Sequence, residues 1–533
     1  MTSSSIRRRL QIEDTEQQQG MFLLFASLLT VVIFHGGLLP FTHENTYDAF
    51  IHMFFGSSYA ANWFDPWESR WYTGFVRVSY PPGTHMLIAM FSKVFSLRIS
   101  FVIVQTIALL IFTLGVFRFS LIWVGFRAAG FAALSMVLSS SIALTVHVFG
   151  QLPTIYSLGM FLNTMPSIYR WVQEGGKKNL AAATIMSAGT TSLHHVTTLF
   201  GCVFFVLPVV LQALMHFAHP KGPDERISVK ALLWAVLRAS LLGIAIIGLI
   251  ILTVFPYWYW SITDPIMQVP IPHGSRENFL VRTDLGMIFF IIPWGLTLLL
   301  WPFLAARALK SRIWPLAMFL ILASVLGTGG TTPVPRIILG DAFDILTLDR
   351  FTFWATVLCA PVMGYFINSV LFGRIGQLLR QTVGRAVYWL MTGLGSAGIV
   401  AFTVAVVILP EARPTQPDFI EPDPIVQFLA EENHDAWRYL TLGFGDQFAY
   451  VSAMTPAYSV DGNYHSARRL PNLTRYSVER LENSKYTGVP GLGSLEQFLV
   501  EADRYNLKYV FSNDQFYDPL LHFTGWQRSL RLS

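Results

Sequence analysis

Long runs of apolar residues, separated by short polar connections, make up most of the sequence between residues 21 and 409. A helix needs about 20 predominantly apolar residues to cross the hydrocarbon core of a bilayer, within a range of about 17 to 25. Applied along the chain, this pattern predicts about 11 transmembrane helices. They fall near residues 21–41, 99–117, 128–147, 154–171, 180–193, 197–214, 231–255, 285–304, 314–325, 352–372 and 386–409.

The composition agrees with a polytopic membrane protein. Hydrophobic residues make up 53% of the chain and charged residues 13%, with a mean hydropathy of +0.48, whereas soluble domains carry about 25% charged residues. Cys202 and Cys359 both lie within apolar runs, where a free thiol behaves as a small hydrophobic group. The sequence therefore excludes a disulfide framework and a cysteine-based metal site.

The placement of Lys and Arg predicts the orientation in the membrane. The polar tail of residues 1–20 carries Arg7, Arg8 and Arg9, and the apolar run that follows has no small-residue cleavage site, which indicates an uncleaved helix entered from the cytoplasm. The loops on that side are then all basic if residues 81–96 form a short helix on the outer surface. The net charge of +5 is explained by this topology, and no nucleic-acid partner is expected. The basic loops contain residues 118–127, 177–178, 221–230, 307–312 and 374–385.

The composition changes after residue 409, at the Pro- and Glu-rich segment PEARPTQPDFIEPDPIVQ. We expect residues 410–533 to form an extracytoplasmic α/β domain. No return strand follows the last predicted strand, which leaves open a continuation of the domain beyond residue 533. The predicted helices cover residues 425–432, 473–481 and 494–505, and the predicted strands cover residues 438–442 and 507–512.

The first external loop, residues 42–98, is unusually rich in carboxylates, histidines, arginines and aromatic residues. Glu44, Asp48 and His52 recur at intervals of four, so a continuous helix would place them on one face. A carboxylate beside an imidazole can act as a general base and its orienting partner. The same spacing is typical of an interfacial amphipathic helix with a solvated polar face, and spacing alone does not separate these alternatives.

Three segments of this loop, YDAFIH, NWFDPWESRWYTG and SYPPG, resemble the first external loop of GT-C glycosyltransferases, multispanning enzymes that use polyprenyl-phosphate sugars. The nearer match is to bacterial membrane proteins labelled 6-pyruvoyl-tetrahydropterin synthase-related, in which an Asp-x-x-x-His is similar to Asp48 and His52. The more distant match is to the catalytic subunits of oligosaccharyltransferases. The resemblance implies a mainly α, GT-C-like bundle over residues 21–409 that transfers a sugar at the outer face of a bacterial plasma membrane.

The resemblance also implies roles for individual residues. Asp48 corresponds to the acid that serves as catalytic base or positions the acceptor, with His52 as its orienting partner and Asp65 as a later acid of the same loop. The implied partners are a polyprenyl-phosphate-linked sugar donor, a lipid, glycan or protein acceptor, and membrane lipids. The remaining polar residues of the loop are expected to bind substrate, namely Glu44, Glu68, Arg70, Tyr80 and His85.

The sequence departs from the oligosaccharyltransferase pattern in the next external loop. Those enzymes place a second acidic motif there and chelate a divalent cation between the two loops, whereas this chain has HVFGQLP, with His147 and Gln151. No cofactor is therefore assigned. A divalent metal held by Asp48, His52 and His147 is the alternative that this ligand set leaves open. The chain also lacks a Trp-Trp-Asp in its C-terminal part, which argues against an Asn-x-Ser/Thr acceptor.

External cations are candidates for binding the donor phosphate. Arg336 and Arg350 lie on the side of the membrane where positive charge is disfavoured, and an arginine fork matches phosphate geometry. Arg276 and Arg282 are further candidates. The alternative for each is a local salt bridge, with Asp349 as the obvious partner of Arg350.

Three functions from different classes are compatible with these patterns. The first is a GT-C glycosyltransferase with an outer cavity between the Asp48 loop and the Arg350 loop. The second is a transporter of lipid-linked sugars, against which stands the scarcity of ionisable residues deep within the spans. The third is a non-catalytic scaffold or a glycan- or lipid-binding protein of the same fold.

Overall fold

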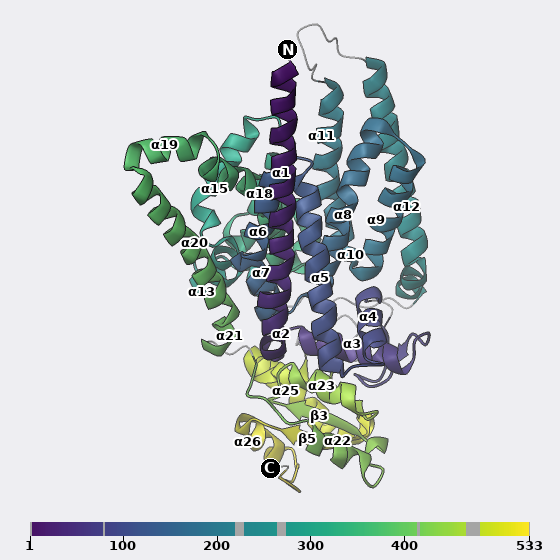
Figure 1. Ribbon diagram of the computed structural model, residues 1–533. Helices are drawn as coiled ribbons and strands as arrows, with labels where there is room; N and C mark the ends of the chain where they lie inside the picture. The colour runs from purple at the N-terminus through teal and green to yellow at the C-terminus, as the bar shows by residue number, and fades with distance from the viewer. Residues whose placement is uncertain are drawn as a thin grey trace.

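A computed structural model of the chain describes residues 3–77, 80–218, 229–263, 273–412, 416–464 and 480–531. It is mainly helical. Long helices run side by side along one direction, and a smaller region with a sheet, here called the outer region (residues 416–531), lies at one end of the bundle (Figure 1). The prediction of a mainly α protein is therefore confirmed.

Seven helical segments within the described residues are long and apolar enough to cross a membrane. An eighth is added if the bent pair α13–α14 and α15 counts as one span, since its halves, Thr283–Trp294 and Thr297–Leu309, meet at 59°. The seven segments are Asp14–Asn45, Leu97–Ser120 (α5), Phe126–Phe149, His195–Phe217, Val229–Phe255, Asp349–Leu371 (α18) and Arg385–Val407 (α20).

The predicted count of about 11 remains a prediction. Three of the predicted spans coincide with helices that do not meet the test of length and hydropathy: α8 (Leu152–Glu174), α9 (Lys177–Leu193) and α16 (Trp314–Leu326). α8 and α9 nevertheless lie among the long helices of the bundle (Figure 1). They are less apolar because they pack against protein, and α8 carries the buried polar residue Asn163.

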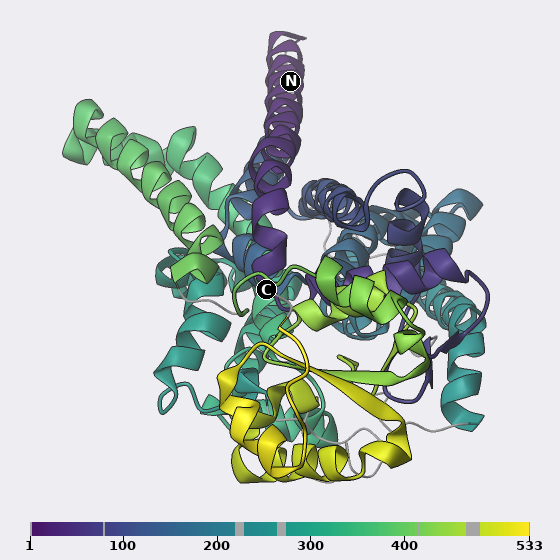
Figure 2. The ribbon, with the colours of Figure 1, turned by 90° about the horizontal axis from the view of Figure 1, so that it is seen from below.

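The other helices of the bundle connect or extend these spans. The first span contains α1 (Ser3–Thr30), the π-helical η1 (Val31–Gly36) and α2 (Gly37–Thr42), and the third contains α6 (Phe126–Val137), α7 (Ser140–Leu144) and η4 (Thr145–Phe149). α20 lies at the edge of the bundle (Figures 1 and 2), and most of its side chains are exposed. The remaining helices are α10 (His195–Gly201), η5 (Cys202–Val206), α11 (Leu207–Ala218), α12 (Val229–Thr263), α17 (Val334–Leu339) and α19 (Arg374–Val383).

Close packing of α5 against α8 depends on two glycines. A Cβ on Gly115 would lie 2.7 Å from the carbonyl oxygen of Gly159, and one on Gly159 would lie 2.7 Å from the backbone of Phe112. Small residues at such a crossing let two membrane helices approach closely. The pair therefore fixes the core of the bundle around which the first external loop is built.

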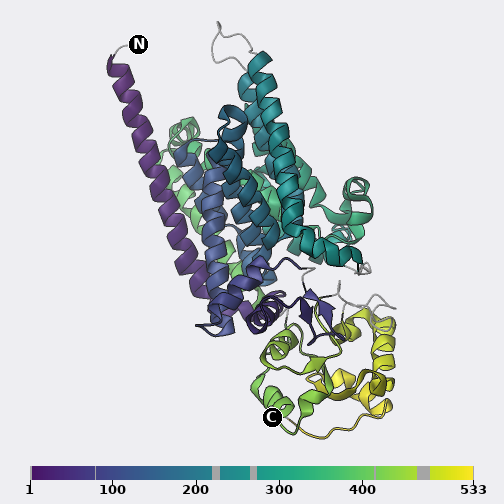
Figure 3. The ribbon, with the colours of Figure 1, turned by 90° about the vertical axis from the view of Figure 1, so that its right-hand side faces the viewer.

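Residues 42–98, the predicted first external loop, contain two short helices and a hairpin. α3 (Ala49–Ala61) and α4 (Gly83–Phe91) pack together, and β1 (Trp67–Glu68) pairs with β2 (Phe75–Val76) in antiparallel fashion. α4 has 9 residues, too few to cross a bilayer. These elements lie between the bundle and the outer region (Figure 3).

The outer region is built on a parallel three-stranded sheet in the order β4-β3-β5. β3 (Arg438–Leu442) and β5 (Leu507–Ser512) coincide with the two predicted strands, and β4 (Tyr458–Ser459) is short. The predicted helix at residues 473–481 lies almost entirely outside the described residues. The definition of residues 410–533 as a separate α/β domain stays a prediction. The main helices around the sheet are α22 (Asp423–Ala430), α23 (Gln447–Met454), α25 (Gly488–Val500) and α26 (Asp518–Phe523).

Aromatic stacking joins the first external loop to the outer region. The Trp71 ring stacks on Phe54 of α3 with the centroids 3.6 Å apart, and its other neighbours include Phe448 of α23 at 5.6 Å. The amide of Ser459 in β4 donates to the carbonyl oxygen of Arg70 at 2.7 Å. The loop therefore packs against the outer region through these rings and is hydrogen-bonded to its sheet.

Candidate functional site

Asp48 lies at the N-terminal end of α3, one residue before the helix begins at Ala49. The prediction that Glu44, Asp48 and His52 share one helical face is wrong. Thr46 has extended backbone angles, and its hydroxyl donates to the carbonyl oxygen of His43 at 2.8 Å. Such a local bond competes with the helix. The helical conformation is therefore interrupted between Glu44 and Asp48. The carboxylate of Glu44 forms an ion pair with Arg98 at 2.8 Å instead.

The bundle fixes the backbone of Asp48. Its amide donates to the carbonyl oxygen of Phe149 at 3.1 Å, and the amide of Tyr47 donates to that of Val148 at 3.3 Å. Both acceptors belong to the end of η4, a π-helical turn, and such turns are frequent at functional sites. The position of Asp48 is thus set by the end of η4 as well as by its own helix.

His52, in the first turn of α3, pairs with His85 of α4. The distance from His52 Nδ1 to His85 Nε2 is 3.1 Å, and both rings are buried. Burial lowers the pKa of His52 well below its usual value and that of His85 to about 3. Both imidazoles are therefore neutral at physiological pH. Within the described residues, the other ring nitrogen of His52, Nε2, has no hydrogen-bond partner.

Tyr80 connects the loop to both charged candidates. Burial raises the pKa of its phenol, the negative charge of Asp48 raises it further, and the positive charge of Arg350 opposes this rise. Its ring stacks on Phe55 at 5.5 Å and meets the edge of Tyr464 at 5.6 Å. Asp48, Tyr80 and Arg350, which are far apart in the sequence, therefore lie within electrostatic reach of one another.

Arg350, in the first turn of α18, is held by its own backbone. Its Nε donates to the carbonyl oxygen of Thr347 at 2.9 Å, and its terminal nitrogen donates to the Thr347 hydroxyl at 2.7 Å. Asp349 accepts instead from Gln151 at 3.0 Å, and no ion pair joins it to Arg350 in the part of the chain that the structure describes. The guanidinium thus donates its hydrogen bonds to Thr347, whereas Asp349 and Asp48 act on it through their charge.

His194 also lies within electrostatic reach of Arg350 and His52. It lies between α9 and α10, and its Nδ1 is 2.8 Å from the Thr197 hydroxyl. Burial lowers its pKa to about 3, and the positive charge of Arg350 contributes to this shift. The structure therefore assembles Asp48, His52, Tyr80, His85, His194 and Arg350, here called the Asp48 cluster.

The other predicted substrate-binding residues lie outside the Asp48 cluster. Arg70 forms a two-point ion pair with Glu68, with Nε to Oε1 at 2.9 Å and the terminal nitrogen to Oε2 at 2.8 Å. It also donates to the carbonyl oxygen of Ser452 in α23 at 3.2 Å. The charged groups of Glu68 and Arg70 bond to each other, and Arg70 also links the loop to the outer region. These intramolecular bonds argue against a role in binding substrate.

Asp65 and the remaining arginines make local contacts. The exposed carboxylate of Asp65 accepts from the amide of Trp67 at 2.9 Å in a turn. Arg336 pairs with Asp344 at 2.9 Å, with both side chains largely exposed. Arg282 pairs with Asp284 at 3.0 Å. Arg336 and Arg282 therefore form local salt bridges, as the alternative to phosphate binding predicted. The structure does not bring Asp65 close to Asp48.

His147 points into the bundle and does not join Asp48. Its Nε2 is 3.0 Å from Nδ1 of His35 in η1, and its Nδ1 is 2.7 Å from the Thr42 hydroxyl. Both ring nitrogens are therefore occupied. The proposed ligand set of Asp48, His52 and His147 is wrong, and among the described residues no three His, Cys, Asp or Glu side chains are placed to hold a metal ion.

Two residues near the Asp48 cluster were not predicted. Tyr464 contacts Tyr80, and Gln416 donates to the carbonyl oxygen of Thr46 at 3.2 Å. Both come from the outer region, more than three hundred residues along the chain, and carry no local motif. Only the change in composition at residue 410 indicated that a further region would face this loop.

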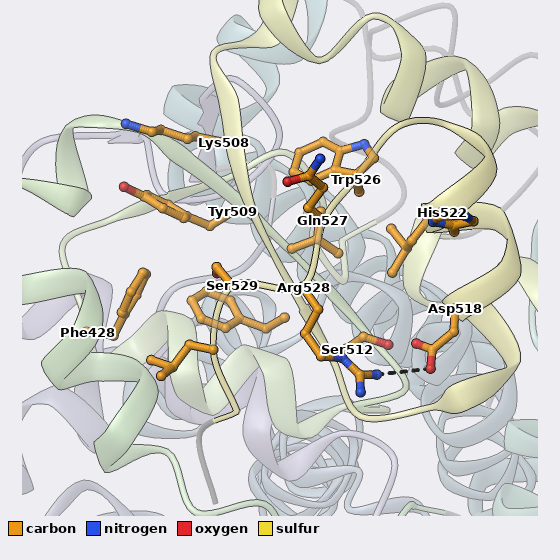
Figure 4. A pocket seen from close by; sticks show the side chains of 14 residues that line it. Phe428, Lys508, Tyr509, Ser512, Asp518, His522, Trp526, Gln527, Arg528 and Ser529 are labelled. Carbon is orange, nitrogen blue, oxygen red and sulfur yellow. Dashed lines mark hydrogen bonds and ion pairs between the residues drawn. The ribbon is translucent and has the colours of Figure 1, made fainter.

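A cavity of about 450 Å³ lies on the outer region away from these residues (Figure 4). Lys508 and Tyr509 of β5 lie on one side, and His522 and Arg528 lie on the other, where Arg528 pairs with Asp518 at 3.1 Å. None of the residues that line it belongs to the Asp48 cluster.

Comparison with known proteins gives a likeness in fold. No family model and no curated protein matches the sequence. The apo oligosaccharyltransferase of Archaeoglobus fulgidus has a TM-score of 0.52 at 14% identity, covering 92% of this chain and 69% of that chain. The oligosaccharyltransferase AglB of the same organism, solved with an inhibitory peptide and a dolichol-phosphate, has a TM-score of 0.51 at 13% identity, covering 95% and 70%.

A third structure, the mycobacterial arabinofuranosyltransferase AftD, has a TM-score of 0.48 at 12% identity and covers 83% of this chain and 33% of that chain. The two archaeal structures show that the chain is similar in fold to these oligosaccharyltransferases over nearly its whole length.

Proposed function

We propose that the protein is a GT-C-type glycosyltransferase that moves a sugar from a polyprenyl-phosphate-linked donor to an acceptor at the extracytoplasmic face of the membrane. The observation that carries this proposal is the assembly of Asp48, Tyr80 and Arg350 from three distant segments. Transfer from a lipid phosphate requires a carboxylate that can accept a proton and a cation that can stabilise the leaving phosphate, and Asp48 and Arg350 supply these two groups.

The carboxylate of Asp48 takes the proton from an acceptor hydroxyl as that oxygen forms a bond to the anomeric carbon of the sugar. The bond between this carbon and the phosphate oxygen breaks, and its electron pair leaves on the phosphate. Arg350 stabilises the developing negative charge by donating hydrogen bonds from its planar fork. His52 and His85 are neutral and buried, so they hold α3 against α4 and keep Asp48 in place.

The residues at this site do not fit a divalent cation. Both ring nitrogens of His147 bond within the bundle, and Gln151, in the place of an acid, donates to Asp349. The proposed chemistry therefore routes no step through a metal.

The identity of the donor rests on the resemblance and on the fold. AglB, which is similar in fold, was solved with a dolichol-phosphate, a lipid of the class that we propose for the donor. The segments around Asp48 and Tyr80 favour the 6-pyruvoyl-tetrahydropterin synthase-related proteins of bacteria as the nearest relatives. We accordingly place residues 410–533 outside a bacterial plasma membrane and residues 1–20 in the cytoplasm.

The proposal is tested with the purified protein in lipid nanodiscs and polyprenyl-phosphate sugars that carry a label in the sugar. With a membrane extract as the source of acceptor, label is expected to leave the lipid fraction in proportion to the amount of protein. Label that stays on the lipid under all conditions would refute transfer and support the scaffold. In sealed vesicles, labelled lipid that crosses the bilayer intact would support the transporter.

A further inference from the structure

A second cavity of about 680 Å³ lies at one edge of the parallel sheet in the outer region. β3 ends at Leu442 and β5 ends at Ser512, and the turns that follow these strands contribute Gly443 and Asp514 to its wall. In open sheets with parallel strands, ligands bind at the carboxyl ends of the strands. The volume is within the range of about 300–1,000 Å³ that is typical of small-molecule sites.

This cavity lies beside the segment that carries Asp48, although no residue of the Asp48 cluster is in its wall. Tyr47, the residue before Asp48, forms part of its wall. Gln416, also in the wall, donates to the carbonyl oxygen of Thr46 at 3.2 Å and accepts from the amide of Asp446 at 2.8 Å. The short segment that carries Asp48 is therefore bonded to the cavity on one side and to the end of η4 on the other.

Glu482 contributes to the cavity a buried carboxylate whose hydrogen-bonding capacity is only partly satisfied. The side chain is 3% exposed, and Oε1 accepts from the amide of Gly445 at 3.0 Å. Oε2 is buried and has no hydrogen-bond partner within the described residues. Such a group is costly to bury without a partner, and a hydroxyl group of a ligand could supply one. Gly445 has a positive φ of 59°, and a Cβ there would lie 2.5 Å from the Gln416 amide oxygen, so a larger residue would be strained and would displace the Gln416 side chain.

The rest of the wall contains both hydrogen-bond acceptors and donors. Asp446 is ion-paired with Arg480, and Lys485 is ion-paired with Asp514. The ring of Tyr486, whose side chain is 76% exposed, lies at the rim. Paired acceptors and donors beside an exposed aromatic ring suit a ligand with many hydroxyl groups and an apolar ring face. The acids in the wall outnumber the bases, which disfavours an anionic ligand such as the donor phosphate.

We propose that this cavity binds a neutral carbohydrate and presents one of its hydroxyl groups toward Asp48 as the acceptor. The assignment rests on the proposed function for its role in transfer, but binding itself can be measured without any donor. It defines the acceptor as a glycan or the sugar part of a glycolipid.

The test is saturation-transfer NMR on the full chain in nanodiscs, with the methyl glycosides of glucose, mannose, galactose and arabinose and disaccharides of each as probes. At least one probe is expected to bind. Removing one hydrogen bond or one stacking ring from a small site weakens binding about tenfold, so Glu482→Ala and Tyr486→Ala are each expected to raise its Kd by about that factor. Tyr486→Ala changes an exposed side chain, so it decides the test if Glu482→Ala does not fold.

Lys508→Gln, in the cavity of Figure 4, is the matched control and is expected to leave the Kd unchanged. The proposal is overturned if no probe binds, or if Tyr486→Ala leaves the Kd unchanged, or if Lys508→Gln weakens binding as much. Sugar binding in this cavity by a protein that never releases label from the lipid donor would refute the proposed function alone. Transfer without binding of any carbohydrate here would refute this inference alone.

Discussion

The buried ion pair between Glu68 and Arg70 should make a large contribution to the attachment of the first external loop, and Arg70→Met tests this. The side chains of Glu68 and Arg70 are 5% and 13% exposed. Arg70 also donates to the Ser57 hydroxyl at 3.1 Å and to the carbonyl oxygen of Ser452 at 3.2 Å. Removing one partner of a buried pair costs about 3–5 kcal/mol, because the other charge is left uncompensated.

The pH dependence of this loss follows from the pKa of Glu68. Burial alone would raise it, but the hydrogen bonds and charge of Arg70 hold it below its usual value. In the native protein the pair therefore adds stability above the unfolded pKa of Glu68, and that stability is lost as the pH falls through the folded pKa. Without Arg70 burial raises the pKa, so Glu68 takes up a proton on acidification. The deficit of Arg70→Met should therefore shrink as the pH falls from 7 toward 5.

The assay is urea unfolding in detergent, followed by tryptophan fluorescence, with Arg504→Met as the matched control. Arg504 pairs with Glu501 at 3.0 Å, but the two side chains are 70% and 41% exposed, and such pairs contribute about 0.2–1 kcal/mol. The double variant Glu68→Gln/Arg70→Met should recover part of the loss. If Arg70→Met cost no more than Arg504→Met at pH 7, the ion pair would not hold the loop and this reasoning would be refuted.

Three further predictions concern Arg350, His147 and Glu482. Arg350→Lys keeps the charge but replaces the planar fork, so the donor KM should rise about tenfold; an unchanged KM would remove Arg350 from the donor site. His147→Phe removes the bonds beneath η4 that position Asp48, so kcat should fall about tenfold with donor KM unchanged, and an unchanged kcat would contradict this. Burial raises the pKa of Glu482 to about 8 from 4.5. The native state then binds the extra proton, so stability should fall by up to about 1.4 kcal/mol per pH unit as pH rises from 5 to 8; Glu482→Gln should abolish this slope, as thermal unfolding would show.

The sequence was most informative where a single physical requirement dominates. The apolar runs predicted the helices of the bundle because length and hydropathy alone decide whether a segment suits a bilayer. β3 and β5 were predicted from short runs of β-branched and aromatic residues. Asp48 and Arg350 were both placed outside the membrane by the charge pattern, and the structure brings them within electrostatic reach of Tyr80.

The errors came from side-chain contacts that residue spacing alone does not specify. A spacing of four suggested one helix from Glu44 to His52, but the hydroxyl of Thr46 ends that helix by bonding to the backbone. Arg70 was expected to bind substrate, yet it bonds to Glu68 and to the carbonyl oxygen of Ser452, which lies 382 residues away. The cavity beside Tyr47 could not be predicted either, because its wall comes mainly from turns of the outer region.

The central claim is that Asp48 is the general base of a transfer reaction, and Asp48→Asn tests it most directly. Asn is nearly isosteric with Asp but cannot take up a proton, and general bases contribute about 10²–10⁴-fold to rate. Single-turnover release of labelled sugar from the lipid donor should therefore fall by about that factor in Asp48→Asn. Folding and donor binding should be preserved, and Asp503→Asn, which changes an exposed acid of the outer region, should react at the wild-type rate. An Asp48→Asn protein that transfers sugar at the wild-type rate would contradict the account.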